Sequence, residues 1–308
     1  ASEDHDFDEI SSIHLFGKTI TWNHAEAKGA VGMLKTESVK PLLDELFDIM
    51  GDSENATLLK DLFIKAYTKQ NNLSDATRVL VHELFKDYSL LIIDGNNKLL
   101  KEQFASFIKQ DFIQRDNYTN VNNSIQQLSS LDYKVQVNPR EINSFYMKDN
   151  LRERIEFHEQ TSSYKVLNTS LQFTEQELLQ ELKQYPEHFS PNVVLRPMYQ
   201  QTILPNIAYV GGPGEIAYWL EYKQMFQKNN VVYPVLIPRN FAMVIELRHV
   251  QMLHKFGFKI QDIFKEYYSL AKDFIALTTG DSLSIKTEEE DIKNRFNHIV
   301  QKALSVDA

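Results

Sequence analysis

The sequence predicts an α/β protein with a parallel, doubly wound core, a small β-rich insertion and a helical end. Three patterns support this. Short apolar runs precede turn-and-helix segments at residues 89–112 and 206–227, as in parallel sheets with helices on both faces. Between about 117 and 172, short stretches alternate polar and apolar residues, as antiparallel strands do. After Leu247 apolar residues advance by threes and fours, which predicts helices.

The composition excludes several classes of protein. None of the 308 residues is cysteine, so these residues cannot form a disulfide framework, a Cys-ligated zinc site, an iron–sulfur cluster or a cysteine nucleophile. The 42 acidic residues exceed the 33 basic ones, and a net charge of −9 argues against a general nucleic-acid-binding protein. No apolar run reaches the ~18–20 residues of a membrane span and no secretory leader is recognised, so we expect a cytoplasmic protein without a membrane partner.

Before the insertion, the apolar spacing predicts helices over residues 39–50 and 58–66, and a third helix that Ser74-Asp75 caps. The continuous apolar run Ser89–Asp94 then predicts a buried strand, followed by a turn and a helix over residues 99–112. An Asx turn leading into Gly95 explains Asp94 better than a contact with ribose does.

The insertion is predicted to hold four short strands, at Lys134–Val137, Ser144–Met147, Arg152–His158 and Tyr164–Leu167. A capping box at Thr174–Glu177 then begins a helix that ends near Pro186.

The parallel pattern resumes after the insertion. It predicts a strand at Asn206–Val210, a helix at Glu215–Gln227 and a strand at Val232–Ile237. A second capping box, at Thr287–Glu290, opens the last helix, and the apolar repeat over residues 260–274 suits a coiled-coil seam or a bundle helix. We therefore divide the chain into a first part of the core (1–116), the insertion (117–189), a second part of the core (190–247) and a helical segment (248–308).

An acidic cluster near the start of the chain is the first candidate site. Glu3, Asp4, His5 and Asp6 place three carboxylates and an imidazole within four residues. They could bind a magnesium ion, recognise a substrate ammonium or supply a general base. A solvated acidic turn explains the same residues without any chemistry.

The glycine-rich segment Gly211-Gly212-Pro213-Gly214-Glu215 lies between a predicted strand and a predicted helix. Glycines there would let the backbone approach a ligand, and the start of the helix would offer N–H groups to an anion. Pro213 interrupts the dinucleotide-binding fingerprint, however, and a tight turn without a ligand fits equally well.

Two arginines, Arg196 and Arg239, follow predicted buried strands. Guanidinium groups in such places often bind a carboxylate or phosphate with two parallel hydrogen bonds. The alternative is a structural ion pair with a neighbouring acidic side chain.

Four motifs together resemble the bacillithiol biosynthesis cysteine-adding enzymes. They are ASEDHDF (Ala1–Phe7), SPNVVLRP (Ser190–Pro197) followed by Tyr199-Gln200-Gln201, YVGGPGEIAYW (Tyr209–Trp219) and VLIPRN (Val235–Asn240). The resemblance covers essentially the whole chain. It implies a Rossmann-like core similar to class I aminoacyl-tRNA synthetases, a connective-peptide insertion, and a helical coiled coil that pairs two subunits in a homodimer.

Members of this family carry a first strand and a glycine-rich loop before the ASEDHDF motif. The chain is therefore expected to be an internal fragment that lacks this strand and loop and most of the coiled coil.

The reaction that the resemblance implies joins the carboxyl group of cysteine to the amine of glucosaminyl-malate, with ATP or another nucleotide as activator and Mg²⁺ as an optional partner. The resemblance implies catalytic roles for Asp4, His5 and Asp6. It implies substrate binding by Glu3, Arg196, Tyr199, Gln200, Arg239 and Asn240, and nucleotide binding by Gly211, Gly212, Gly214 and Glu215. No metal ligands are assigned. Cysteine-specific synthetases select the thiol with a zinc ion held partly by cysteines, and this chain has none, so thiol selection stays unassigned.

The same residues fit two other functions. One is a nucleotide-binding scaffold or sensor without catalysis, and the other is a metal-dependent hydrolase built on Glu3–Asp6. For the ligase we expect Glu3–Asp6, Arg196, Gly211–Glu215 and Arg239 to meet in one cleft, because the carboxyl ends of parallel strands share one edge of the sheet.

Overall fold

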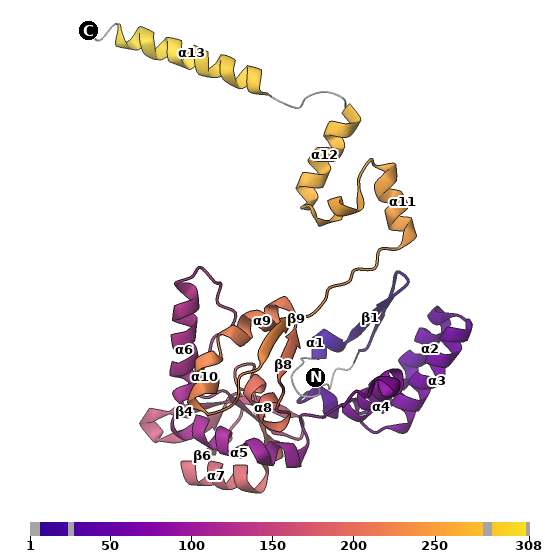
Figure 1. The fold of residues 1–308 in the computed structure, drawn as a ribbon, viewed down its shortest axis with the longest axis vertical. Helices are drawn as coiled ribbons and strands as arrows, with labels where there is room; N and C mark the ends of the chain where they lie inside the picture. The colour runs from indigo at the N-terminus through magenta and orange to yellow at the C-terminus, as the bar shows by residue number, and fades with distance from the viewer. Residues whose placement is uncertain (1–6, 24–27, 280–284, 306–308) are drawn as a thin grey trace. The chain divides into compact units, whose positions relative to one another are not determined.

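The computed structural model describes residues 7–23, 28–279 and 285–305 (Figure 1). The chain divides into two units, Ala1–Arg239 and Asn240–Ala308.

The first unit begins with the short helix α1 (Phe7–Ile10) and the antiparallel hairpin of β1 (Ser12–Leu15) and β2 (Lys18–Thr21). Phe16 and Gly17 reverse the chain with φ values of 49° and 78°, as a two-residue hairpin turn requires. Two 3₁₀ turns follow, η1 (Val31–Met33) and η2 (Thr36–Ser38).

Helices α2 (Lys40–Met50), α3 (Glu54–Lys69) and α4 (Leu73–Phe85) confirm the three predicted helices. Ala66 of α3 and Ala76 of α4 are completely buried, and such small side chains let two helices approach closely. The predicted cap of α4 is wrong by two residues: the side chain of Asn72 accepts a hydrogen bond from the Asp75 N–H at 2.8 Å. A 3₁₀ turn, η3 (Lys86–Tyr88), ends this part.

The predicted strand Ser89–Asp94 is wrong, because this segment pairs with no strand in the part of the chain that the structure describes. Its apolar side chains Ile92 and Ile93 line a cavity instead. The Asx turn is confirmed, since the Asp94 carboxylate accepts a hydrogen bond from the Asn96 N–H at 2.9 Å. Asn97 then caps α5 (Lys98–Ile113), the predicted helix, whose Phe104, Ile108 and Phe112 are buried.

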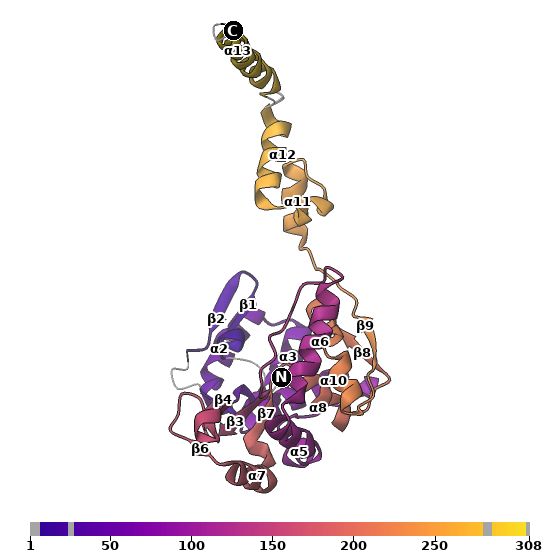
Figure 2. The same cartoon turned by 90° about the vertical axis from the view of Figure 1, so that its left-hand side faces the viewer.

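The insertion begins with a helix where the sequence suggested β structure. Helix α6 (Asp116–Ser129) packs beside α10 (Lys223–Lys228) (Figures 1 and 2). The buried Asn117 links α6 to the end of α10, because its Oδ1 accepts a hydrogen bond from the side chain of Asn229 at 3.0 Å. The predicted strand Lys134–Val137 is also wrong, because the N–H groups of Gln136 and Val137 donate to the Glu221 carboxylate, at 2.7 and 3.3 Å.

A five-stranded antiparallel sheet confirms the other three predicted strands. Its order is β6-β5-β4-β3-β7, from β3 (Ser144–Lys148), β4 (Leu151–His158), β5 (Ser163–Val166), β6 (Gln172–Phe173) and β7 (Phe189–Pro191). A 3₁₀ turn, η4 (Glu159–Thr161), connects β4 to β5. The predicted capping box of α7 (Glu175–Gln184) is confirmed, because Thr174 and Glu177 each accept a hydrogen bond from the backbone N–H of the other. A further 3₁₀ turn, η5 (Pro186–His188), leads into β7.

The parallel part of the first unit comes last. After α8 (Arg196–Ile203), strand β8 (Ala208–Gly211) pairs in parallel with β9 (Val235–Pro238), with Gly211 opposite Pro238. The helix predicted between them is present as two pieces, α9 (Pro213–Leu220) and α10. The buried core joins these helices to α5, α7 and the antiparallel sheet, and its largest side chains include Trp219, Tyr222, Phe226, Tyr199 and Phe189.

The second unit is helical, as predicted. It contains α11 (Leu247–Lys255), the 3₁₀ segment η6 (Ile260–Phe264), α12 (Tyr267–Thr279) and α13 (Lys286–Leu304). The predicted capping box at Thr287 is wrong, because α13 begins at Lys286 without a side-chain cap. Within the described ranges, no helix is both long enough and apolar enough to cross a membrane.

Candidate functional site

The carboxyl ends of β8 and β9 bring the glycine-rich loop to Arg239. Gly211 ends β8, and its carbonyl oxygen accepts a hydrogen bond from the Arg239 N–H at 2.9 Å. The loop from Gly211 to Gly214 and the guanidinium of Arg239 therefore lie at the same edge of the parallel pair (Figure 1 shows β8, β9 and α9).

Glu215 contacts both the glycine-rich loop and Arg239 at this edge. Its carboxylate accepts hydrogen bonds from the Gly212 N–H at 2.6 Å and the Tyr209 hydroxyl at 2.8 Å, and lies 3.6 Å from the Arg239 Nη1. The Gly212 N–H, with Tyr209 and Arg239, holds the pKa of Glu215 below its usual range although burial acts in the opposite direction. Burial and the bond to Glu215 raise the pKa of Tyr209, so its hydroxyl stays protonated and donates.

A side chain at Gly212 would crowd the charged groups at this edge. Its φ of −69° is open to any residue. A Cβ atom there would lie 3.0 Å from the Arg239 Nη2 and 3.2 Å from the Glu215 Oε2. A side chain would therefore push the guanidinium and the carboxylate away from the loop.

The ion pair between Arg239 and Glu215 is largely exposed, at 60% and 37% of the two side chains. Exposed pairs contribute little to stability because water and salt screen them. The guanidinium is thus accessible to an anion in solution, and its pairing with Glu215 is a weak structural reason for its presence.

A second cluster forms where α8 meets the turn after Asp94. The guanidinium of Arg196 lies against the backbone of Gly95, where a Cβ atom would be 3.1 Å from the Arg196 Nη1. The buried Tyr199 donates a hydrogen bond from its hydroxyl to the Gly95 carbonyl at 2.7 Å, and Arg196 lies 5.9 Å from the Tyr199 ring centre. Gln200, half-buried, is the next residue of α8.

The structure thus brings together two groups of the predicted residues. Gly211–Glu215 meet Arg239, and Arg196 meets Tyr199. Convergence of both groups on one cleft stays a prediction. Glu3, Asp4, His5 and Asp6 lie outside the described residues, and Asn240 begins the second unit.

Sequence reasoning missed Gly95 and Tyr209, which contact Arg196 and Glu215. Gly95 was interpreted only as part of a turn, and no local pattern marks Tyr209 as a partner of Glu215 six residues later.

In the parts of the chain that the structure describes, no three histidine, aspartate or glutamate side chains are grouped to hold a metal ion.

The family model and the relatives that match this chain all point to one family. The family model described as "Bacillithiol biosynthesis BshC, N-terminal Rossmann-like domain" matches residues 1–240. The chain is 40% identical over 307 residues to a Flavobacterium johnsoniae protein named "Putative cysteine ligase BshC" and 41% identical over 307 residues to the Flavobacterium psychrophilum protein of the same name. A Staphylococcus saprophyticus protein of that name is 27% identical over 324 residues.

These matches extend over nearly all of the chain but only part of each relative. They cover 100% of the chain for both Flavobacterium proteins and 99% for the Staphylococcus protein. The chain spans 57% of the length of the first two relatives and 58% of the third.

Proposed function

Because the chain belongs to the BshC family of bacillithiol biosynthesis and contains its Rossmann-like domain, we propose that it is part of a ligase that joins the carboxyl group of cysteine to the amine of glucosaminyl-malate. The observation that carries the proposal is the meeting of the Gly211–Gly214 backbone with the exposed guanidinium of Arg239, at the carboxyl end of the parallel pair. Ligands of open α/β sheets bind at this edge.

An amide does not form from a free carboxylate without activation, so the reaction needs a nucleotide such as ATP to make an acyl-adenylate or acyl-phosphate. The loop of Gly211, Gly212 and Gly214 suits a phosphate group, since its backbone is close to a cation. The Gly212 N–H now donates to Glu215. A phosphate that takes this N–H would displace the Glu215 carboxylate and would find Arg239 beside it.

Magnesium is part of the proposal only as a partner of the nucleotide. The described residues hold no group of three carboxylate or histidine ligands. Mg²⁺ would therefore be bound mainly by phosphate oxygens and water, as it is in many nucleotide sites.

The second substrate gives Arg196 and Arg239 a role in binding. Glucosaminyl-malate carries two carboxylates, which Arg196 and Arg239 would bind, with Tyr199 orienting Arg196 and with Gln200 and Asn240 as further polar contacts. The substrate amines are cationic until they lose a proton, which suits Glu3, Asp4 and Asp6, with His5 as the base.

The larger architecture belongs to the same proposal. It comprises a core like that of class I synthetases, a connective-peptide insertion and a cytoplasmic homodimer held by a coiled coil. Helix α13 supports the last part, because all its side chains are exposed and its apolar ones form a stripe: Ile292, Phe296, Ile299, Val300 and Leu304.

The test uses the full-length protein. Given cysteine, glucosaminyl-malate and ATP, it should form bacillithiol, which mass spectrometry detects, and omission of any one substrate should abolish the product. Nucleotide binding without product under these conditions would instead support a scaffold or sensor without catalysis.

A further inference from the structure

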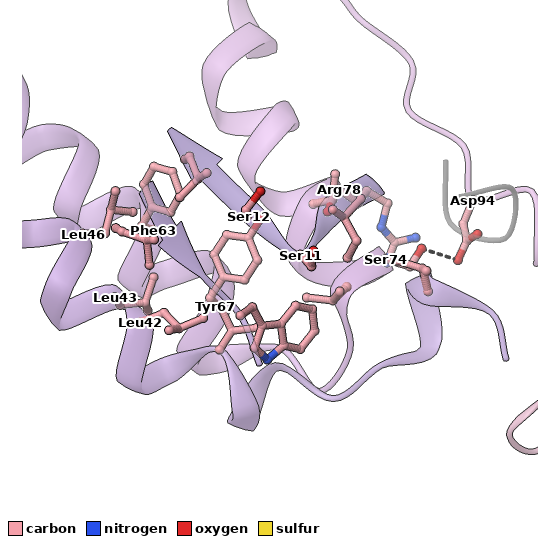
Figure 3. A pocket seen from close by; sticks show the side chains of 18 of the residues that line it. Ser11, Ser12, Leu42, Leu43, Leu46, Phe63, Tyr67, Ser74, Arg78 and Asp94 are labelled. Carbon is pink, nitrogen blue, oxygen red and sulfur yellow. Dashed lines mark hydrogen bonds between the residues drawn. The ribbon is translucent and has the colours of Figure 1, made fainter. Parts of the chain in front are cut away.

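A cavity of about 590 Å³ lies in the first unit, between the β1–β2 hairpin, helices α2, α3 and α4, and the segment Ser89–Asp94 (Figure 3). Its walls are mostly apolar and include Leu42, Leu43, Leu46, Phe63, Ile92 and Ile93. Binding sites for small organic molecules have this size, roughly 300–1,000 Å³, and this kind of lining.

Polar groups are few in the cavity and gather at defined places. Tyr67 and Thr77 both line the cavity, and burial raises the pKa of Tyr67, so its hydroxyl stays protonated. At one end the Ser74 hydroxyl donates to the Asp94 carboxylate at 2.7 Å, and Arg78 lies nearby (Figure 3). A few convergent polar groups on an apolar wall fix the orientation of a bound molecule.

The charged groups at this end already have polar partners. Arg78 is paired with Asp75 at 2.9 Å, and the Asp94 carboxylate accepts from Ser74. An anionic ligand would meet the negative Asp94 carboxylate and an arginine that is already paired, and any charged group against the apolar walls loses its hydration, which costs free energy. The geometry therefore favours an uncharged ligand.

We propose that this cavity is a second binding site, for an uncharged organic molecule with an apolar ring or chain and one hydrogen-bonding group directed to Ser74 and Asp94. Cysteine, glucosaminyl-malate and a nucleotide phosphate are all charged, so the ligand differs from the substrates proposed above. Asp94 directly precedes Gly95, against which Arg196 and Tyr199 pack. A ligand in the cavity would thus contact the turn that supports Arg196.

The probe for the test is N-phenylnaphthylamine, an uncharged aromatic molecule with one N–H donor whose fluorescence rises in apolar surroundings. Titrated into the 308-residue chain, it should saturate at one probe per chain. Thr77→Trp should weaken binding at least about tenfold, equivalent to ~1.4 kcal/mol, because a large side chain at this exposed lining position fills the cavity. Thr68→Trp is the matched control, an exposed threonine of α3 outside the lining.

A second pair of variants guards against a change in folding. Leu42→Asp places a charge in the wall and should also weaken binding, whereas Leu58→Asp, at a position 63% exposed outside the cavity, should not. Circular dichroism would check that each variant is folded.

Absence of saturable binding, or equal binding by Thr77→Trp and Thr68→Trp, overturns the proposal. The full-length Flavobacterium johnsoniae relative provides a separate check. If it is folded but does not bind the probe, the cavity is filled by polypeptide in the whole protein, and the small-molecule site is wrong.

Discussion

Arg239 is a residue at which stability and binding can be separated. Its side chain is 60% exposed and its partner Glu215 lies 3.6 Å away, so Arg239→Ala should change the free energy of unfolding by no more than ~0.5 kcal/mol. If the guanidinium binds a substrate carboxylate, the same substitution should weaken the binding of that substrate by roughly 2–5 kcal/mol. Melting temperature and substrate affinity of the full-length protein measure the two effects.

Arg248→Ala is the control for Arg239→Ala, since Arg248 is equally exposed, at 62%, and also pairs with a glutamate. It should leave both quantities unchanged. A lowered melting temperature with unchanged affinity in Arg239→Ala would make this arginine structural.

Two glycines of one loop should respond in opposite ways to alanine. A Cβ atom at Gly211 would lie 2.6 Å from the Tyr209 ring, which stacks on Trp219 with ring centres 4.3 Å apart. Gly211→Ala should therefore lower stability by about 1–3 kcal/mol. Gly214 lies in α9 with no atom within 4 Å of its Cβ position, so alanine there should raise stability by up to ~1 kcal/mol. Urea unfolding compares them, and equal effects would contradict this account of the loop.

Asp111 makes the stability of the protein depend on pH. Burial raises the pKa of this carboxyl to about 6, although the N–H of Asn143 and the side chains of Asn117 and Asn143 donate to it. Because this pKa lies above that of the unfolded chain, the stability from Asp111 is fully present below about pH 4 and is lost as the pH rises through about 6. Its contribution to the free energy of unfolding should be about 1 kcal/mol larger at pH 5 than at pH 7.5.

Asp111→Asn provides the comparison, because an amide of the same shape does not titrate. Denaturant unfolding of both proteins at the two pH values isolates the contribution of Asp111 to the free energy of unfolding. The same pH dependence in both would show that Asp111 is ionised throughout this range.

At the scale of elements, Gly29 fixes the segment before η1 against the turn between β3 and β4. It has a φ of 78°, and a Cβ atom there would lie 3.0 Å from the backbone of Asn150. Gly17 has the same φ of 78° but an open surrounding. Both alanine variants should lose ~1 kcal/mol or more to backbone strain, and Gly29→Ala should lose more in thermal unfolding. Equal losses would mean that the contact with Asn150 adjusts without cost.

Several of the elements that sequence reasoning found have a strong local signal. The capping box at Thr174 and the alternation at Arg152–His158 depend on neighbours within a few residues, and both are present. Ser89–Asp94 and Lys134–Val137 have strand-like composition, yet distant groups decide their structure. In the first, Ile92 and Ile93 face a cavity, and in the second a carboxylate 85 residues away binds the backbone.

In the candidate site, too, the sequence predicts some contacts and not others. The strand, glycine and helix pattern predicted that Gly211–Glu215 lie at the end of a strand, and the pairing of β8 with β9 explains why Arg239 joins them. The contact of Arg196 with Gly95 could not be predicted, because it joins residues about a hundred positions apart and depends on how α5 packs against α8.

At the scale of the whole molecule, α13 should govern association. Phe296 and Ile299 are 65% and 61% exposed on its apolar stripe. Burial of such side chains is worth ~1.5–3 kcal/mol each. Under the dimer proposal, replacing both by glutamate in the full-length protein should raise the dissociation constant at least about 100-fold.

Sedimentation velocity measures this change. Asn294→Glu is the control, because residue 294 lies roughly 160° around the helix from Phe296. A dimer that survives the double substitution would place the interface elsewhere.

Because β7 lies beside β3, the chain between these two strands can vary in length while the geometry around Arg196 stays the same. The 40 residues between Lys148 and Phe189 leave β3 and return to it, and Tyr146 stands opposite Phe189 in the register. From β7 the chain runs through Asn192, whose N–H donates to the Asn143 carbonyl, directly into α8. Insertions at the exposed turns near Glu159 and Asn168 would lengthen the excursion without moving its two ends. Evolution can therefore remodel the outer strands of this lobe while the start of α8 keeps its place.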